Sequence, residues 1–207
     1  MEELDRLQQA MQLLHWKRPE SVPFPSVQKR YVGRRPLKGA GGHSPPTYVI
    51  QEVPGDRQEE AIRLMADVFL REEPLTAAFR ITDDPEPKSE RLQRVVSVVR
   101  KFEALVQPDV FERFGVREYL SAVGLVVAHE HRGQGLGEQL LRARWQLGRS
   151  LGLRATATMF TGPASQLLAR RAGFHTLAEA RYVDQEQPAV RAITGASCMK
   201  IMAAALE

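Results

Sequence analysis

The sequence is poor in cysteine, in long apolar runs and in leader-like segments. Cys198 is the single cysteine among 207 residues, which excludes an internal disulfide and a thiolate zinc cluster. Apolar runs are short and interrupted by charge, so none is long enough to span a bilayer. No charged-then-apolar leader opens the chain, and we expect a cytoplasmic protein. The 43% apolar and 26% charged residues are typical of one globular domain with a tail.

Positive charge is concentrated near the N-terminus. Residues 1–46 hold eight Lys and Arg against four Asp and Glu, which accounts for the whole net charge of +4. Because residues 47–207 are neutral overall, the body of the chain does not resemble a nucleic-acid binder. Apolar residues at helical spacing predict a short amphipathic helix over residues 2–16. Residues 19–46 are rich in Pro, Gly and basic side chains, so we expect a disordered linker there and a single domain over 47–207.

Strand and helix patterns alternate along residues 47–207, as in an α/β fold. Strands are predicted over residues 47–53, 119–128, 154–160, 175–183 and 198–203. Helices are predicted from Asp56 to before Pro74, from Ser89 to before Pro108, and over 136–151 and 163–172, with a short segment at 109–115. The first helix is expected to bury Ala61, Ile62, Met65, Ala66 and Phe69 on one face. The run 119–128 (YLSAVGLVVA) is apolar throughout, which is typical of a strand buried on both faces.

A glycine-rich turn joins this apolar run to the helix at 136–151. Its sequence is Arg132-Gly133-Gln134-Gly135-Leu136-Gly137. Glycines permit a tight turn whose N–H groups point the same way, and the helix start adds unpaired N–H groups and the positive end of its dipole. The pattern therefore predicts a phosphate or pyrophosphate site. Gly-Lys-Ser/Thr is missing, and Glu138 stands where a dinucleotide fingerprint needs glycine, so neither of those loops fits. A turn that only reverses the chain stays open as an alternative.

The pattern R-x-x-G-x-G after the apolar run resembles the acetyl-CoA signature of the GNAT acyltransferase superfamily. Gly173-Phe174, after the helix at 163–172, matches the closing GF of that superfamily. Residues 69–75 (FLREEPL) resemble the F-x-x-x-E-P-L element of insect-type arylalkylamine N-acetyltransferases, and residues 161–165 (TGPAS) resemble their hydroxyl-rich segment. The resemblance covers residues 47–183 in segments and implies an α/β GNAT fold.

The resemblance implies direct transfer of an acetyl group from acetyl-CoA, as co-substrate, to a small primary amine such as an arylalkylamine. Glu73 would then be the general base, and Thr161 and Ser165 would support acceptor binding and proton transfer. The backbone of Val126 and Val127 would pair with the pantetheine arm. The residues expected at the pyrophosphate are Arg132, Gly133, Gln134, Gly135, Leu136 and Gly137.

Plainer interpretations stand beside these roles. Thr161 and Ser165 could equally cap a helix, and Glu73 could be an exposed carboxylate at a helix end. His129 and His131 lack the i, i+4 helical spacing of a zinc pair, so no metal is expected. Cys198 is expected in the core of the last strand.

One element of the GNAT pattern is not found. These domains carry a β-hairpin between the acceptor-side helices and the cofactor strand, and here it is expected to be missing near residues 85–89. The central mixed sheet would then be reduced, and residues 119–128 would have an unpaired edge. Two other functions therefore stay open: a catalytically weak or inactive relative that binds acetyl-CoA or a partner protein, and an acetyltransferase acting on protein amines.

Overall fold

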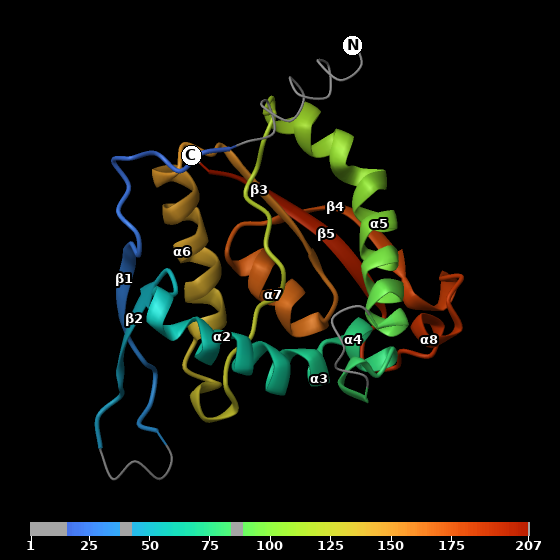
Figure 1. Cartoon of the computed structure of the whole chain (residues 1–207), viewed down its shortest axis with the longest axis horizontal. Helices are drawn as coiled ribbons and strands as arrows, with labels where there is room; N and C mark the ends of the chain where they lie inside the picture. Colours follow the sequence, from blue (N-terminus) through green and yellow to red (C-terminus); the bar gives the residue numbers. More distant parts are fainter. Residues whose placement is uncertain (1–15, 38–42, 84–88, 207) are drawn as a thin grey trace.

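The computed structural model describes residues 16–37, 43–83 and 89–206 (Figure 1). The predicted amphipathic helix over residues 2–16 lies almost entirely outside these ranges. The predicted site of the missing hairpin, near residues 85–89, also lies largely outside them. Within the described ranges, no helix is both long and apolar enough to cross a membrane.

The strands form two separate antiparallel sheets (Figure 1). The smaller sheet is the hairpin of β1 (Val27–Val32) and β2 (Thr47–Gln51), which lies beside α6 (Leu136–Ser150). The larger sheet has the order β3-β5-β4. Its strands are β3 (Ala155–Phe160), β4 (His175–Arg181) and β5 (Cys198–Ala205). Four of the five predicted strands are confirmed as β2, β3, β4 and β5.

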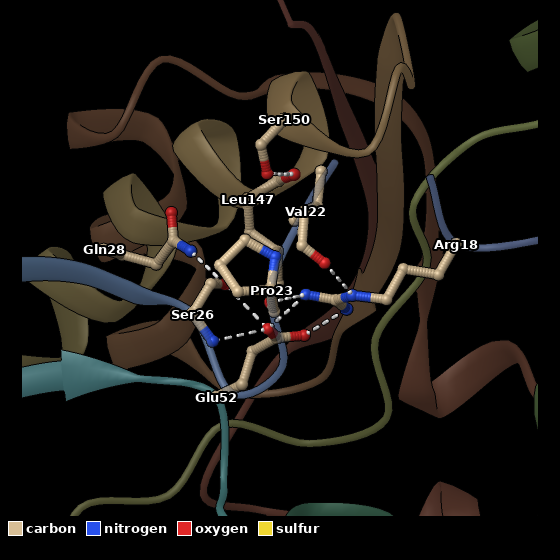
Figure 2. A network of polar contacts seen from close by, with 8 residues as sticks. All are labelled: Arg18, Val22, Pro23, Ser26, Gln28, Glu52, Leu147 and Ser150. Carbon is tan, nitrogen blue, oxygen red and sulfur yellow. Dashed lines mark hydrogen bonds and ion pairs between the residues drawn. The ribbon is translucent and has the colours of Figure 1, made fainter. Parts of the chain in front are cut away.

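Strand β1 corrects the prediction that residues 19–46 are disordered. The sequence of β1 does not look like a strand with one buried apolar face. Its apolar Val27 and Val32 are exposed, whereas Gln28, Lys29 and Tyr31 are half-buried. A polar cluster at the open end of the hairpin fixes the preceding chain (Figure 2). Arg18 donates to both carboxylate oxygens of Glu52, at 2.8 and 2.6 Å, and the backbone N–H and hydroxyl of Ser26 donate to the same carboxylate at 3.0 and 2.7 Å. The partners are 34 and 26 residues apart, so no local pattern reveals them.

The helices that lead to Glu73 follow β2 as one nearly continuous run. It comprises η1 (Gly55–Arg57), α2 (Gln58–Leu64), η2 (Met65–Phe69) and α3 (Leu70–Glu72), and Glu73 then begins α4 (Pro74–Ala78). Element η2 is a π-helical turn, which adds a residue to the turn and rotates the helix faces on either side of it. Met65 and Phe69 consequently lie against Gly124, but Ile62 is 66% exposed and Ala66 is also exposed. The prediction that the first helix buries all its apolar residues on one face is therefore wrong.

Helix α5 (Glu90–Phe114) follows the short η3 (Ile81–Asp83). Ser89 caps it by accepting the N–H of Leu92 at 3.2 Å. The expected end before Pro108 is wrong, since the helix continues to Gly115, which has a left-handed φ of 56°. Proline costs a helix one hydrogen bond and a bend. Burial of Val110 against Ala157 and Ala203 favours the longer helix nonetheless.

The predicted strand over residues 119–128 is also wrong. Leu120 alone forms a bridge, parallel to Thr156 of β3, and the Thr158 hydroxyl donates to the carbonyl of Ala122 at 2.6 Å. Beyond Ala122, no hydrogen bond joins this segment to β3 within the described ranges. The described residues between α4 and this segment contain no strand that could pair with its other edge. An apolar run without partners on either side cannot form a regular strand.

Helices cover both faces of the larger sheet. Helices α6 and α7 (Pro163–Arg171) pack on one face, where Met202 and Ala204 of β5 join a buried cluster. Helices α4, α5 and α8 (Pro188–Arg191) pack on the other, against Met199 and Ile201. The alternation along β5 thus divides the core into two layers. Cys198 is buried at the start of β5, which confirms it as a core residue.

Candidate active site

The glycine-rich turn presents a row of unpaired backbone N–H groups. It follows η4 (His129–His131), and Gly135 forms the N-cap of α6 with a φ of 85°. Gly133 also has a left-handed φ, of 76°. In the described part of the chain, the N–H groups from Gly133 through Glu138 find no acceptor. A row of such N–H groups at the positive end of a helix dipole is an arrangement that can bind an anion.

Strand β1 and the residues just after it form hydrogen bonds with the glycine-rich turn. The Tyr31 hydroxyl donates to the carbonyl of Gln134 at 2.7 Å, and the Arg35 guanidinium donates to the carbonyl of Arg132 at 3.2 Å. The side chain of Gln134 is 1% exposed and turns back toward the hairpin. It accepts the N–H groups of Arg34 and Arg35 at 2.8 and 3.1 Å, and donates to the Arg35 carbonyl at 2.9 Å. The sequence gives no signal for these contacts, because they join residues about a hundred positions apart.

The side chain of Arg132 is directed at the acceptor-side helices. It donates to Glu72 at 2.6 Å and to the carbonyl of Val127 at 3.0 Å. The other Glu72 oxygen contacts the His129 ring. Arg132 first and His129 second lower the pKa of the Glu72 carboxyl. Arg132 thus links the turn to the end of α3, a connection that sequence reasoning missed.

Val126 and Val127 differ in what their backbones offer. Both are half-buried and precede η4. The carbonyl of Val127 is occupied by Arg132, whereas the N–H and carbonyl of Val126 have no partner among the described residues. Since the last hydrogen bond to β3 in the described part of the chain is at Ala122, the backbone of Val126 is not part of the sheet.

Glu73 is the half-buried N-cap of α4. Its carboxylate accepts the N–H groups of Leu75 and Thr76 at 3.1 and 2.7 Å. Such contacts hold the carboxylate in one orientation. Tyr182, in η5 (Tyr182–Asp184), lies close by: burial raises the pKa of its hydroxyl, and the charge of Glu73 raises it further.

The start of α7 lies next to Pro74, the residue after Glu73. A Cβ on Gly162 would stand 3.8 Å from Cγ of Pro74, and the Tyr182 hydroxyl donates to the carbonyl of Thr161 at 2.7 Å. The N-cap of α7 is Gly162, so Thr161 does not cap it. Ser165 directs its hydroxyl to the Gly162 carbonyl at 2.9 Å. The fold therefore brings the segments of Glu73, Thr161 and Ser165 together from distant parts of the sequence.

The two histidines near the turn have separate partners. His131 contacts the Tyr48 hydroxyl through Nδ1 at 3.2 Å, and His129 contacts Glu72. Within the ranges that the structure describes, no three His, Cys, Asp or Glu side chains gather as a metal site would require.

Comparisons with known proteins agree with this architecture. Residues 104–174 match the model of the acetyltransferase (GNAT) family. Arylalkylamine N-acetyltransferase 7 from the mosquito Aedes aegypti superposes with a TM-score of 0.79 and 28% identity, over 93% of this chain and 100% of that one. No curated protein matches significantly.

Two further structures support the fold alone. Arylalkylamine N-acetyltransferase 2 from Aedes aegypti gives a TM-score of 0.65 at 17% identity, over 75% of this chain and 97% of that one. A mosquito arylalkylamine N-acetyltransferase-like protein, 5b, gives 0.51 at 20% identity, over 65% and 63%. The predicted α/β GNAT fold is confirmed by the family match and the superposition on arylalkylamine N-acetyltransferase 7.

Proposed function

Because the chain carries a GNAT acetyltransferase domain, we propose that it transfers the acetyl group of acetyl-CoA to a small primary amine of the arylalkylamine class. The row of unpaired N–H groups from Gly133 through Glu138 carries this proposal. A diphosphate is the part of acetyl-CoA that such a row binds. The similarity to arylalkylamine N-acetyltransferase 7 supports the class of acceptor.

The coenzyme side would bind through backbone groups. Gly133, Gln134, Gly135, Leu136 and Gly137 would donate to the diphosphate through their backbone N–H groups. The free N–H and carbonyl of Val126 suit the amide groups of a pantetheine arm. Arg132 would contribute its backbone and charge, while its side chain holds the end of α3. Val127 would contribute its N–H, because its carbonyl is occupied.

Glu73 would remove the proton that keeps the acceptor unreactive. A primary alkylamine has a pKa near that of lysine, so at pH 7 only about one molecule in a thousand is free base, a cost of ~4 kcal/mol. The neutral amine nitrogen then attacks the thioester carbon, the C–S bond breaks, and the CoA thiolate leaves and takes up the second amine proton. Thr161 and Ser165, beside it, would orient the acceptor. A positioned base of this kind contributes roughly 10²- to 10⁴-fold in rate.

A catalytically silent coenzyme binder is the second candidate. Residues beyond Ala122 lack strand partners among the described residues, which favours a loosened acceptor floor. A displacement of about 1 Å at the reacting groups can cost on the order of a hundredfold in rate.

Calorimetry followed by turnover separates the candidates. The purified chain is titrated with acetyl-CoA, and thiol release is then measured with tryptamine, dopamine and a lysine-containing peptide. Binding with release on the arylalkylamines supports the proposal, and release on the peptide alone would replace its acceptor class. Binding without turnover would establish the silent binder. Absence of binding would refute both candidates.

A further inference from the structure

We infer that Tyr31 and Arg35 are positioning residues that aim the N–H groups of the glycine-rich turn away from the β1–β2 hairpin. This inference rests on the proposed coenzyme site. Neither residue belongs to the R-x-x-G-x-G pattern, and both lie in the part of the chain that its composition predicts as linker. The hairpin would thereby act on the proposed coenzyme site by orienting the turn.

The argument starts from the geometry of the peptide bond. A trans peptide is planar, and its carbonyl and N–H point in opposite directions. The carbonyl of Arg132 is held by Arg35, so the N–H of Gly133 in the same peptide faces away from the hairpin. The carbonyl of Gln134 is held by Tyr31, so the N–H of Gly135 also faces away. Two of the predicted donors are thus oriented by bonds on the opposite edge of their peptides.

Gln134 fixes the distance between hairpin and turn. Its buried amide accepts two backbone N–H groups and donates to one carbonyl, all from Arg34 and Arg35. A buried amide that loses such partners pays the full desolvation cost, so the register between the two segments is strongly defined. The turn cannot rotate without breaking this set.

Gly133 is required for the approach of Arg35. It occupies a position that the R-x-x-G-x-G pattern leaves free, yet a Cβ there would collide with the Arg35 guanidinium. At Gly135 a Cβ would stand 2.7 Å from the Tyr31 hydroxyl and 2.8 Å from Nε of Arg34. Contact with the hairpin therefore favours glycine at both positions, in addition to their positive φ.

The test removes the Tyr31 hydroxyl and compares two acetyl donors, one with and one without the diphosphate. Tyr31→Phe deletes the donor to Gln134, whereas Tyr48→Phe deletes a hydroxyl of the same hairpin that contacts only the His131 ring among the described residues. Affinity for CoA is measured by calorimetry. Rates are measured with acetyl-CoA and with S-acetylpantetheine, which lacks the diphosphate. Loss of one hydrogen bond predicts a roughly 3- to 10-fold higher Kd for CoA in Tyr31→Phe.

The remaining readouts separate positioning from general damage. In Tyr31→Phe, kcat at saturating acetyl-CoA and kcat/KM for S-acetylpantetheine should stay within about twofold, and Tyr48→Phe should leave CoA affinity unchanged. The inference is overturned if the Kd for CoA is unaltered in Tyr31→Phe, or if kcat/KM falls equally with both acetyl donors. Either result leaves the proposed function standing. If Tyr31→Phe does not fold, Arg35→Met takes its place. Its loss with acetyl-CoA is then compared with its loss with S-acetylpantetheine. A wild-type chain without CoA affinity overturns the proposed function instead.

Discussion

The proposed coenzyme side and the proposed acceptor side of this chain are stabilised over very different distances along the sequence. The turn before α6 is held by Tyr31, Arg34 and Arg35, about a hundred residues earlier. Glu73, by contrast, is oriented by the N–H groups of Leu75 and Thr76, two and three residues later. A local cap survives changes elsewhere in the fold, whereas a turn held from a distance depends on the hairpin that reaches it. Substitutions should therefore separate coenzyme affinity from the rate of chemistry.

The largest effect is expected from Gly135→Val. The left-handed φ of 85° strains any L side chain, and the new atoms would collide with Tyr31 and Arg34. We expect more than a hundredfold loss of acetyl-CoA affinity by calorimetry. Gly152→Val is the matched control, since Gly152 has a similar φ of 76° but no atom within 4 Å of its Cβ position. Retained affinity in Gly135→Val, with a folded spectrum, would show that the turn is not the phosphate site.

The next effect is expected from Glu73→Gln. Removing the proposed base should lower kcat at pH 7 by about a hundredfold or more, with CoA affinity nearly unchanged. Gln keeps an acceptor for the α4 cap, so any loss of stability should be that of a weakened cap, roughly 1 kcal/mol. Ser89→Ala weakens the cap of α5 instead and should leave kcat alone. An unchanged kcat in Glu73→Gln would remove Glu73 from the mechanism.

This contrast also explains what the sequence could predict. The turn, the helix after it and four strands follow from local patterns of glycine, apolar period and β-branched residues. The role of the 16–37 segment does not, because its polar contacts to Glu52 and Gln134 are long-range. The run 119–128 has the composition of a buried strand, but composition does not reveal whether a neighbour exists. The predicted site residues follow from a family resemblance, and their roles stay predictions.

A smaller effect, on the stability of the fold, is expected when acid protonates Glu52 at the open end of the hairpin. Arg18 first, and then Ser26, lower the pKa of Glu52 to about 2. A carboxyl whose pKa is lower when folded adds stability above its ordinary pKa, near 4.5, and loses it as the pH falls toward 2. We expect Glu52→Gln to be less stable than wild type by about 1–3 kcal/mol at pH 7, with the difference shrinking on acidification.

Urea unfolding between pH 7 and pH 3 measures this difference. Glu186→Gln is the control, because Glu186 forms an exposed pair with Lys101 at 2.8 Å and should change little. A constant gap between Glu52→Gln and wild type across the pH range would contradict the assigned role of the Glu52 charge. Glu52→Gln should also weaken CoA binding more than it lowers kcat, since the hairpin serves the coenzyme side.

The smallest effect is expected from Glu72→Gln. It tests whether Glu72 affects coenzyme affinity while its neighbour Glu73 affects the rate of chemistry. Glu72 holds Arg132 of the turn, but this pair is 44% and 43% exposed, so its loss should raise the Kd for acetyl-CoA only about two- to fivefold. Glu130→Gln removes a neighbouring exposed charge and should change nothing. Because Arg132 lowers the pKa of Glu72, the difference from wild type should persist at neutral pH and vanish below the ordinary carboxyl range. A fall in kcat as large as that expected for Glu73→Gln would transfer the role of base to Glu72 and end the division between the two sides.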